Sequence, residues 1–478
     1  MLKRIRIENF ESLKFLDVNC ANLNVLTGLN GSGKSSFVQF INFLMCYARK
    51  ELRARLCCSC KELELPGVFE DVKYCYAREN EHVKFHVDFE AKDSFVWDEG
   101  ELQRGSLDRI ICADKYERTD VCVETWDVHQ LELQAHGVDE RNSGASQILE
   151  SEGDRKSKYE RLWGCIRSEE AREKLMQRAF QNVWENAKII TAFRTSPNNV
   201  HIGSGRYGSM EDATKFDGLF DSEGGNTMEY LYKFGRIIKL DQANPMIYPG
   251  SELHERRCSA ANEDDLGVCF MDDPLKYEFE DVDTRKFSTL AEQVDAWLGV
   301  ISPGAHLNIT REVIRYEEMY LATVGFGKNE YERRFRPQNV GFGISYVLPV
   351  LVAVLTARPT DIVIIENPEA YLHPRGQSEM GKLLARAAAY GVQVFVETHS
   401  DHVINGIRVS AKMGILRPSD INISFFDRHK HKVRYADGIR DEYYADVFSI
   451  KVDKNGALSN YPAGFLDEWD NLYYHLNC

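Results

Sequence analysis

The sequence predicts an α/β fold whose central sheet is largely parallel and covered by helices on both faces. Continuous apolar runs stand at 362–365 (IVII) and 392–396 (VQVFV), and residues 375–390 between them have the pattern of a helix. Strands that alternate with helices and carry such runs are typical of parallel sheets, because both faces of these strands are packed. A glycine-rich loop between a strand pattern and a helix pattern near residue 30 supports the same class.

The N-terminal third predicts an antiparallel β subdomain around that loop. Residues 2–27 alternate as three short strands, and 62–100 contain two more strand-like stretches, VKYCYA and VKFHVDF. Between them, apolar residues recur at helical spacing directly after the glycine loop. We therefore expect an N-terminal lobe over 1–104 that is built from strand, loop and helix. The helical positions are Phe37, Phe40, Ile41, Leu44 and Tyr47.

The middle third predicts a mostly helical insertion with mobile loops over 105–300. Residues 126–157 and 198–226 are polar, whereas 159–187 mix charged and apolar residues as exposed helices do. An independent second domain would have the same pattern. Further on, 306–314 and 319–326 are expected to be strands, an apolar helix is expected from about Ser345 to Ala357, and the helix over 375–390 should end at Gly391. These elements define a C-terminal lobe over 301–440 and a short final domain over 441–478.

Composition restricts the functional class. The formal net charge of −15 argues against binding DNA through the overall field, so a DNA contact would need a local basic patch. No export signal is visible in MLKRIRIENF, and the longest apolar run, 347–357, is too short to span a bilayer. We therefore expect a cytoplasmic protein without a membrane partner. The twelve cysteines are scattered, and the one cluster, Cys57, Cys58 and Cys60, fits helix-end thiols better than a zinc site.

The glycine loop matches the eight-residue P-loop pattern from Gly28 to Ser35. Its backbone N–H groups would surround phosphates, Lys34 would contact the β- and γ-phosphates, and the Ser35 hydroxyl would bind Mg²⁺. The sequence therefore predicts ATP with Mg²⁺. The expected ATP-binding residues of this loop are Asn30, Gly31, Ser32, Gly33, Lys34, Ser35 and Ser36.

Three further motifs follow in a fixed order. Gly341, Gly343 and Ser345 open an apolar helix, Glu366 ends a buried strand as a metal-binding acid of the Walker B type would, and His399 follows the next strand. At that strand end a histidine would lie beside the γ-phosphate or the attacking water.

This order of motifs resembles the ATP-binding-cassette ATPases of the SMC, RecF and OLD type. ENPEAYLHP and ETHSDHVINGIR look like their stand-alone bacterial members, which accompany anti-phage effectors, and ITAFRTSP (190–197) is a fainter match. The tail YPAGFLDEWDNLYYHL resembles a short C-terminal domain of unknown function on a subset of them. The resemblance implies an ABC-type fold, an ATP-sandwiched dimer in which Ser345 with Gly341 and Gly343 acts in trans, and roles for Glu366 and His399 at the nucleotide.

Asn367 departs from the pattern of this family, in which a glutamate after the Walker B acid acts as general base. An amide orients water but does not accept a proton. Hydrolysis is then slow and ATP holds an assembly, or Glu369 or His399 activates water, or a partner supplies the missing group.

Two functions follow from the resemblance. The first is an ATPase subunit that acts as sensor or scaffold of a prokaryotic antiviral defence complex, with a nuclease or toxin on a separate chain. The second is a RecF-like ATPase that clamps DNA. The basic residues that would serve the second are Arg53, Arg55, Lys61, Arg333, Arg334 and Arg336.

Overall fold

The computed structural model describes a defined part of the chain, which forms two compact units. The N-terminal unit draws on residues 1–19, 40–60 and 64–185, and the P-loop unit on 20–39, 61–63 and 186–478. The described residues are 1–48, 73–77, 82–92, 102–113, 119–127, 180–181, 183–184, 187–192, 200–202, 226–240, 244–248, 289–314, 317–326, 334–435 and 438–477.

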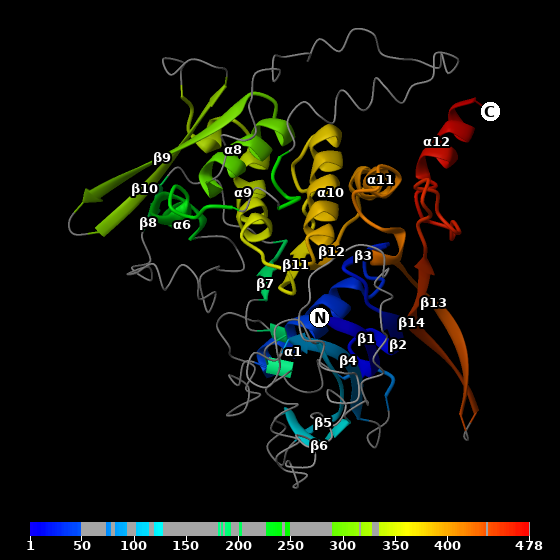
Figure 1. Ribbon diagram of the computed structural model, residues 1–478. Helices are drawn as coiled ribbons and strands as arrows, with labels where there is room; N and C mark the ends of the chain where they lie inside the picture. The colour runs from blue at the N-terminus through cyan, green and yellow to red at the C-terminus, as the bar shows by residue number, and fades with distance from the viewer. Residues whose placement is uncertain are drawn as a thin grey trace, which may run out of the picture. The chain divides into compact units, whose positions relative to one another are not determined.

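The N-terminal unit contains a five-stranded antiparallel sheet in the order β2-β1-β4-β5-β6 (Figure 1). This confirms the predicted antiparallel β subdomain. VKFHVDF lies in β4 as expected, but the described part of VKYCYA, residues 73–77, forms an isolated bridge and a turn instead of a strand. The strands are β1 (Leu2–Phe10), β2 (Leu13–Asn19), β4 (Val83–Lys92), β5 (Leu102–Ala113) and β6 (Thr119–Asp127).

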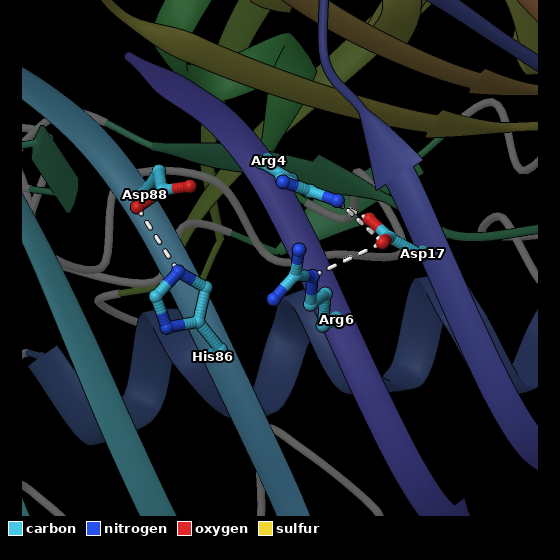
Figure 2. A network of polar contacts seen from close by, with 5 residues as sticks. All are labelled: Arg4, Arg6, Asp17, His86 and Asp88. Carbon is cyan, nitrogen blue, oxygen red and sulfur yellow. Dashed lines mark hydrogen bonds and ion pairs between the residues drawn. The ribbon is translucent and has the colours of Figure 1, made fainter.

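One face of this sheet is apolar and the other carries charged side chains. Figure 2 shows the charged face, where Arg4 and Arg6 of β1 both donate to the Asp17 carboxylate of β2, at 2.6–3.0 Å. On β4, His86 and Asp88 lie 3.0 Å apart between Nε2 and Oδ1. The hydrogen bonds from Arg4 hold the pKa of Asp17 below its ordinary value. Pairs this exposed contribute about 0–1 kcal/mol each, so this unit depends mainly on its apolar face.

The P-loop unit is built on a six-stranded sheet in the order β14-β13-β3-β12-β11-β7. Five strands run parallel, and β14 pairs antiparallel with β13 at the edge. The predicted mixed, mostly parallel α/β sheet is therefore confirmed. The strands are β3 (Leu23–Gly28), β7 (Lys188–Ile190), β11 (Ile362–Glu366), β12 (Gln393–Glu397), β13 (Ile421–Tyr435) and β14 (Gly438–Ile450).

Both faces of this sheet are buried, as its continuous apolar runs predicted. Val25, Val363 and Val394 share a core cluster with residues of α8 (Leu290–Ile301), α9 (Phe342–Leu355), α10 (Pro374–Ala389) and α11 (Asp401–Lys412). Figure 1 shows α9 and α10 side by side on that face. The other face is also buried, and there the ring of Phe426 lies 6.1 Å from that of Phe37 in α1 (Lys34–Ala48).

Several boundaries differ from the sequence predictions. The helix expected from Ser345 begins at Phe342, because Gly341 adopts the positive φ of 95° from which the helix starts. The predicted domain limits at 104 and 440 fall inside β5 and β14. Within 105–300 the described residues include strands as well as α6 (Thr227–Phe234) and α8.

A smaller antiparallel sheet in the order β8-β10-β9 completes the P-loop unit. Its strands are β8 (Val200–Ile202), β9 (Ala305–Ile314) and β10 (Glu317–Phe326), so the two strands expected after residue 300 are present. None of the helices formed by the described residues is both long and apolar enough to cross a membrane.

Candidate functional site

The glycine loop from Gly28 to Gly33 connects the central strand β3 to α1. Gly28, Gly31 and Gly33 have φ values of 139°, 73° and 104°, which residues other than glycine rarely adopt. A Cβ on Gly28 would lie 2.1 Å from the carbonyl oxygen of Phe426, so only glycine fits there. The sequence thus forms the P-loop where it was predicted, at the N-terminus of a helix.

Lys34 is buried in this loop. Its Nζ donates to the carbonyl oxygens of Gly28 at 2.9 Å and Leu29 at 2.7 Å. Burial lowers the pKa of Lys34, and the negative charge of Glu397 opposes that shift. The ammonium is therefore held inside the cradle of backbone groups where phosphates bind in P-loop proteins.

Two carboxylates end neighbouring strands beside the P-loop. Glu366 of β11 and Glu397 of β12 are paired in register, and Glu397 Oε1 accepts a hydrogen bond from Ser35 Oγ at 3.2 Å. Burial, and then the negative charge of Glu366, raise the pKa of Glu397 to about 7. Glu397 is absent from the residues that the sequence pointed to, although it ends its strand just as Glu366 does.

Glu366 is further held by the strand at the sheet edge. Its Oε2 accepts from the backbone N–H of Ala192 at 2.9 Å, two residues beyond the end of β7. Ala192 belongs to the ITAFRTSP stretch, of which residues 190–192 are described. This part of the middle third therefore contributes directly to positioning the Glu366 carboxylate.

Asn367 occupies an unusual backbone conformation immediately after Glu366. Its φ is +44°, and its N–H donates to the carbonyl oxygen of Glu397 at 2.8 Å. Among non-glycine residues, asparagine is one of the few that adopt this left-handed region readily. Asparagine thus has a conformational reason to stand at position 367.

Glu369 and His399 are connected to each other. Glu369 Oε1 accepts from the backbone N–H of His399 at 2.9 Å, which ties the loop after β11 to the end of β12. Partial desolvation lowers the pKa of His399, and the positive charge of Lys34 lowers it further. The imidazole of His399 is therefore neutral at pH 7 and is able to donate or accept a hydrogen bond.

The glycine–serine segment packs against the loop that follows β11. A Cβ on Gly343 would lie 2.7 Å from the carbonyl oxygen of Tyr371, and the rings of Tyr346 and Tyr371 are 4.8 Å apart. Ser345 is half-buried in the first turn of α9 and does not cap it, since the helix starts at Gly341. These contacts place the segment beside the loop that follows β11, which is named the Walker B loop after the motif expected at Glu366.

The donor set at the sheet edge suits Mg²⁺. The Ser35 hydroxyl and the carboxylates of Glu366 and Glu397 are oxygen donors, which Mg²⁺ prefers, and such sites commonly combine one or two carboxylates with substrate phosphates. The metal would neutralise charge on those phosphates.

Other residues singled out from the sequence are exposed basic residues or lie outside the described part of the chain. Arg334 and Arg336 are exposed ahead of a short 3₁₀ turn, η3 (Pro337–Asn339). The cysteine cluster and the remaining basic residues, Cys57, Cys58, Cys60, Arg53, Arg55, Lys61 and Arg333, lie outside the described residues.

Three family descriptions match parts of the chain. Residues 1–231 match an "AAA ATPase domain", 246–405 match an "AAA domain, putative AbiEii toxin, Type IV TA system", and 416–476 match a "Protein of unknown function (DUF3696)". The first two ranges contain the P-loop and the Glu366 segment. A search of curated proteins finds no match.

Solved structures similar to the chain include SMC head domains at low identity. The head bound to the C-winged helix domain of ScpA is 10% identical with a TM-score of 0.42, over 94% of this chain and 97% of that one. A Pyrococcus furiosus head with an extended coiled coil, bound to the C-terminal domain of ScpA, gives 13% and 0.43, over 100% and 99%. The Thermotoga maritima head gives 9% and 0.34, over 94% and 99%.

The P-loop, the two strand-end acids and the matched ATPase domains agree with one another. The lysine, the hydroxyl and the carboxylates required to bind a nucleoside triphosphate with a metal meet at one edge of one sheet. These observations identify an ATP-binding ATPase with an α/β P-loop fold, in which residues 1–231 and 246–405 match ATPase domains.

Proposed function

We propose that the chain hydrolyses ATP slowly and uses bound ATP to hold an assembly. The observation that carries this proposal is Asn367, which follows Glu366 in a left-handed conformation and offers no group that accepts a proton. Its amide is suited to orienting a water molecule. A fast ATPase of this class would need a base there, and a φ of +44° favours asparagine over glutamate, because the short amide side chain can hydrogen-bond to the local backbone.

The other candidate bases have structural tasks. Glu369 uses one carboxylate oxygen to accept from the His399 N–H and so fixes the position of that residue relative to β11. His399 is suited to a hydrogen bond with the γ-phosphate, because its imidazole is neutral at pH 7. Glu397 accepts a hydrogen bond from Ser35 and would bind the metal together with Glu366.

ATP-held assembly is supported by the surface around Tyr371. Tyr371 is 66% exposed, has a φ of +62°, and packs on Gly343 at the start of α9. The Walker B loop and the glycine–serine segment therefore share one surface. A second copy that faces this surface would place its own Gly341–Ser345 segment against the bound nucleotide, as the trans arrangement requires.

A role in antiviral defence is the second part of the proposal. It is supported by the match of residues 246–405 to a domain described with a toxin–antitoxin system. The effector would be a separate chain encoded nearby. Purifying the chain together with its genomic neighbours, with and without ATP, tests this part: co-elution of an effector that depends on ATP is expected, and elution of the chain alone in both conditions would contradict it.

A steady-state phosphate-release assay tests slow hydrolysis. We expect low turnover, a further loss in Glu366→Gln, and a change of only a few-fold in Asn367→Ala. Robust turnover that collapses in Glu369→Gln but survives in Asn367→Ala would show that Glu369 is the base and would overturn the proposal. Nucleotide binding measured on the same variants separates a loss of chemistry from a loss of ATP.

A further inference from the structure

The β13–β14 hairpin carries a group of metal-ligand side chains that is separate from the ATP site. His429, His431 and Asp446 each place one ligand atom within 4.8 Å of the others. The hairpin lies within residues 416–476, the range matched by the domain of unknown function. Nothing in the chemistry of ATP binding uses these three side chains.

The register of the hairpin explains why they meet. His429 and His431 are two residues apart on β13 and so point to the same face, and Asp446 on β14 is opposite Asp427. His429 Nε2 lies 3.1 Å from Asp446 Oδ2, and His431 Nε2 lies 3.6 Å from the same oxygen. Two imidazole nitrogens therefore converge on one carboxylate.

These distances fit a bound divalent ion. A tetrahedral ion with nitrogen and oxygen donors at about 2.0–2.2 Å holds neighbouring donors about 3.3 Å apart. The separations of 3.1 and 3.6 Å lie on either side of that value. In addition, His431 Nε2 is buried and makes no hydrogen bond. A buried ring nitrogen that faces a carboxylate beyond hydrogen-bond distance is satisfied if a cation lies between them.

The surrounding residues orient the rings and add negative charge. His431 stacks on Tyr444 with ring centroids 3.7 Å apart and planes 8° apart, which fixes the ring. Asp427 Oδ2 lies 3.6 Å from His429 Nδ1, on the side of the ring away from Asp446. Carboxylates often take this place behind a metal-bound histidine. Asp427 and Asp446 are also directly opposite each other, an arrangement of like charges that a cation stabilises.

We propose that His429, His431 and Asp446 bind one divalent transition-metal ion, Zn²⁺ first among them, on the β13–β14 hairpin. Two imidazoles and one carboxylate are a donor set that Zn²⁺ accepts, and Zn²⁺ binds such sites more tightly than Mn²⁺ or Fe²⁺. Three protein ligands leave a fourth position for water or for a group from a partner. The ion would also cross-link the two strands of a hairpin at the edge of the sheet.

Cobalt absorption tests the site in the full-length protein. The metal-stripped chain is titrated with Co²⁺ in excess Mg²⁺, so that the carboxylates at the P-loop do not bind the probe. We expect one equivalent of Co²⁺ to bind and to show the d–d absorption bands of nitrogen and oxygen ligands. Zn²⁺ should then displace the bound Co²⁺. Affinity should fall at least about 10-fold in His431→Gln and in Asp446→Asn, a conservative bound since mutating outer-shell partners alone typically costs 10–100-fold.

The matched control is His306→Gln. His306 of β9 pairs with Asp295 of α8 at 2.8 Å, and among the described residues this pair is not part of a group of metal-ligand side chains, so this variant should bind Co²⁺ as the parent chain does. No d–d absorption, or absorption unchanged in both hairpin variants, would overturn the proposal. A thiolate-to-cobalt charge-transfer band in place of the d–d bands would assign the metal to cysteines and would also overturn it.

Thermal unfolding of the metal-free proteins shows whether the substitutions disturb the fold itself or only metal binding. His431→Gln and Asp446→Asn should melt within a few degrees of the parent chain when metal-free. Zn²⁺ should raise the melting temperature of the parent and of His306→Gln only. Equal stabilisation of all four proteins by Zn²⁺ would contradict a site on the hairpin.

Discussion

At the scale of single residues, the backbone conformation at position 367 accounts for the presence of asparagine there. A φ of +44° costs an ordinary side chain about 1–2 kcal/mol relative to glycine, and asparagine less. We therefore predict that Asn367→Gly unfolds at the same or higher urea concentration than the parent chain, while Asn367→Ala loses about 1 kcal/mol. If the alanine variant were as stable as the glycine variant, the conformational explanation would be wrong and the amide side chain itself would be what matters.

Glu397 is the residue whose role the sequence alone did not reveal. It accepts from Ser35 and stands in register with Glu366. Removing its charge in Glu397→Gln should lower ATP turnover at least about 10-fold, because mutating the groups that support a metal site typically costs about 10–100-fold in metal affinity or activity. Binding of ATP should persist, since Lys34 and the P-loop backbone are unchanged.

The control for this prediction is Glu379→Gln on α10. Glu379 is ion-paired with Lys382 at 2.6 Å, so this variant also removes one negative charge, and its turnover should equal that of the parent. Phosphate release measured at saturating ATP gives both values. Unchanged turnover in Glu397→Gln would show that its carboxylate is only a structural partner of Ser35.

At the scale of elements, the sequence predicted most of the helices and strands whose positions depend on residues close together in the chain. The helix expected over 375–390 is α10, Pro374–Ala389, and the apolar run 362–365 is β11. VKYCYA has a strand-like pattern, but its described residues form a bridge and a turn, because contacts elsewhere in the fold override local preference. The pairing of Glu366 with Glu397 depends on which strands are adjacent in the sheet, and no local pattern contains that information.

The edge strand β7 provides an element-scale prediction through Lys188. This lysine is fully buried, donates to the Ala353 carbonyl oxygen and to Thr356 Oγ1 at 3.0 Å each, and burial lowers its pKa to about 7. Between pH 7 and about 10.5 the unfolded chain binds this proton and the folded chain does not, so stability should rise with pH over that window.

Lys188→Met should remove this dependence. Its slope of unfolding free energy against pH should be smaller than that of the parent chain, by at most about 1.4 kcal/mol per pH unit. Urea unfolding at pH 7.5, 8.5 and 9.5 measures both slopes. Lys412→Met, at an exposed position on α11, should retain the parent slope; a parallel shift in Lys188→Met without a change of slope would refute the prediction.

At the scale of the whole molecule, the P-loop unit brings together the candidate ATP-site residues, and in our proposal the glycine–serine segment completes the site of a second copy. Gly343 and Tyr346 pack on Tyr371 beside the Walker B loop, which leaves this surface available to a second copy. If ATP binds between two copies, the molecular mass in solution should depend on nucleotide. It should also depend on the P-loop of one copy and on the glycine–serine segment of the other. This dependence distinguishes an assembly held by ATP from a dimer that forms through other surfaces.

Light scattering coupled to size exclusion tests this with three variants. With Mg²⁺ and ATP, the parent chain and Glu366→Gln should elute at twice the mass that they have without nucleotide. Lys34→Ala should remain monomeric because it lacks the charge that holds the phosphates. Ser345→Arg should remain monomeric although it still binds ATP, because its own P-loop is intact while the segment offered to the partner is blocked.

Val409→Arg is the matched control for Ser345→Arg. It adds the same charge at an exposed position of α11 in the same unit and should dimerise as the parent does. A dimer of Ser345→Arg with ATP would mean that the segment is not used in trans, whereas a dimer of every variant without ATP would mean that nucleotide does not control assembly. In a mixed dimer, the intact P-loop of Ser345→Arg would face the intact glycine–serine segment of Lys34→Ala. Mixing the two variants should therefore restore about one intact ATP site per dimer.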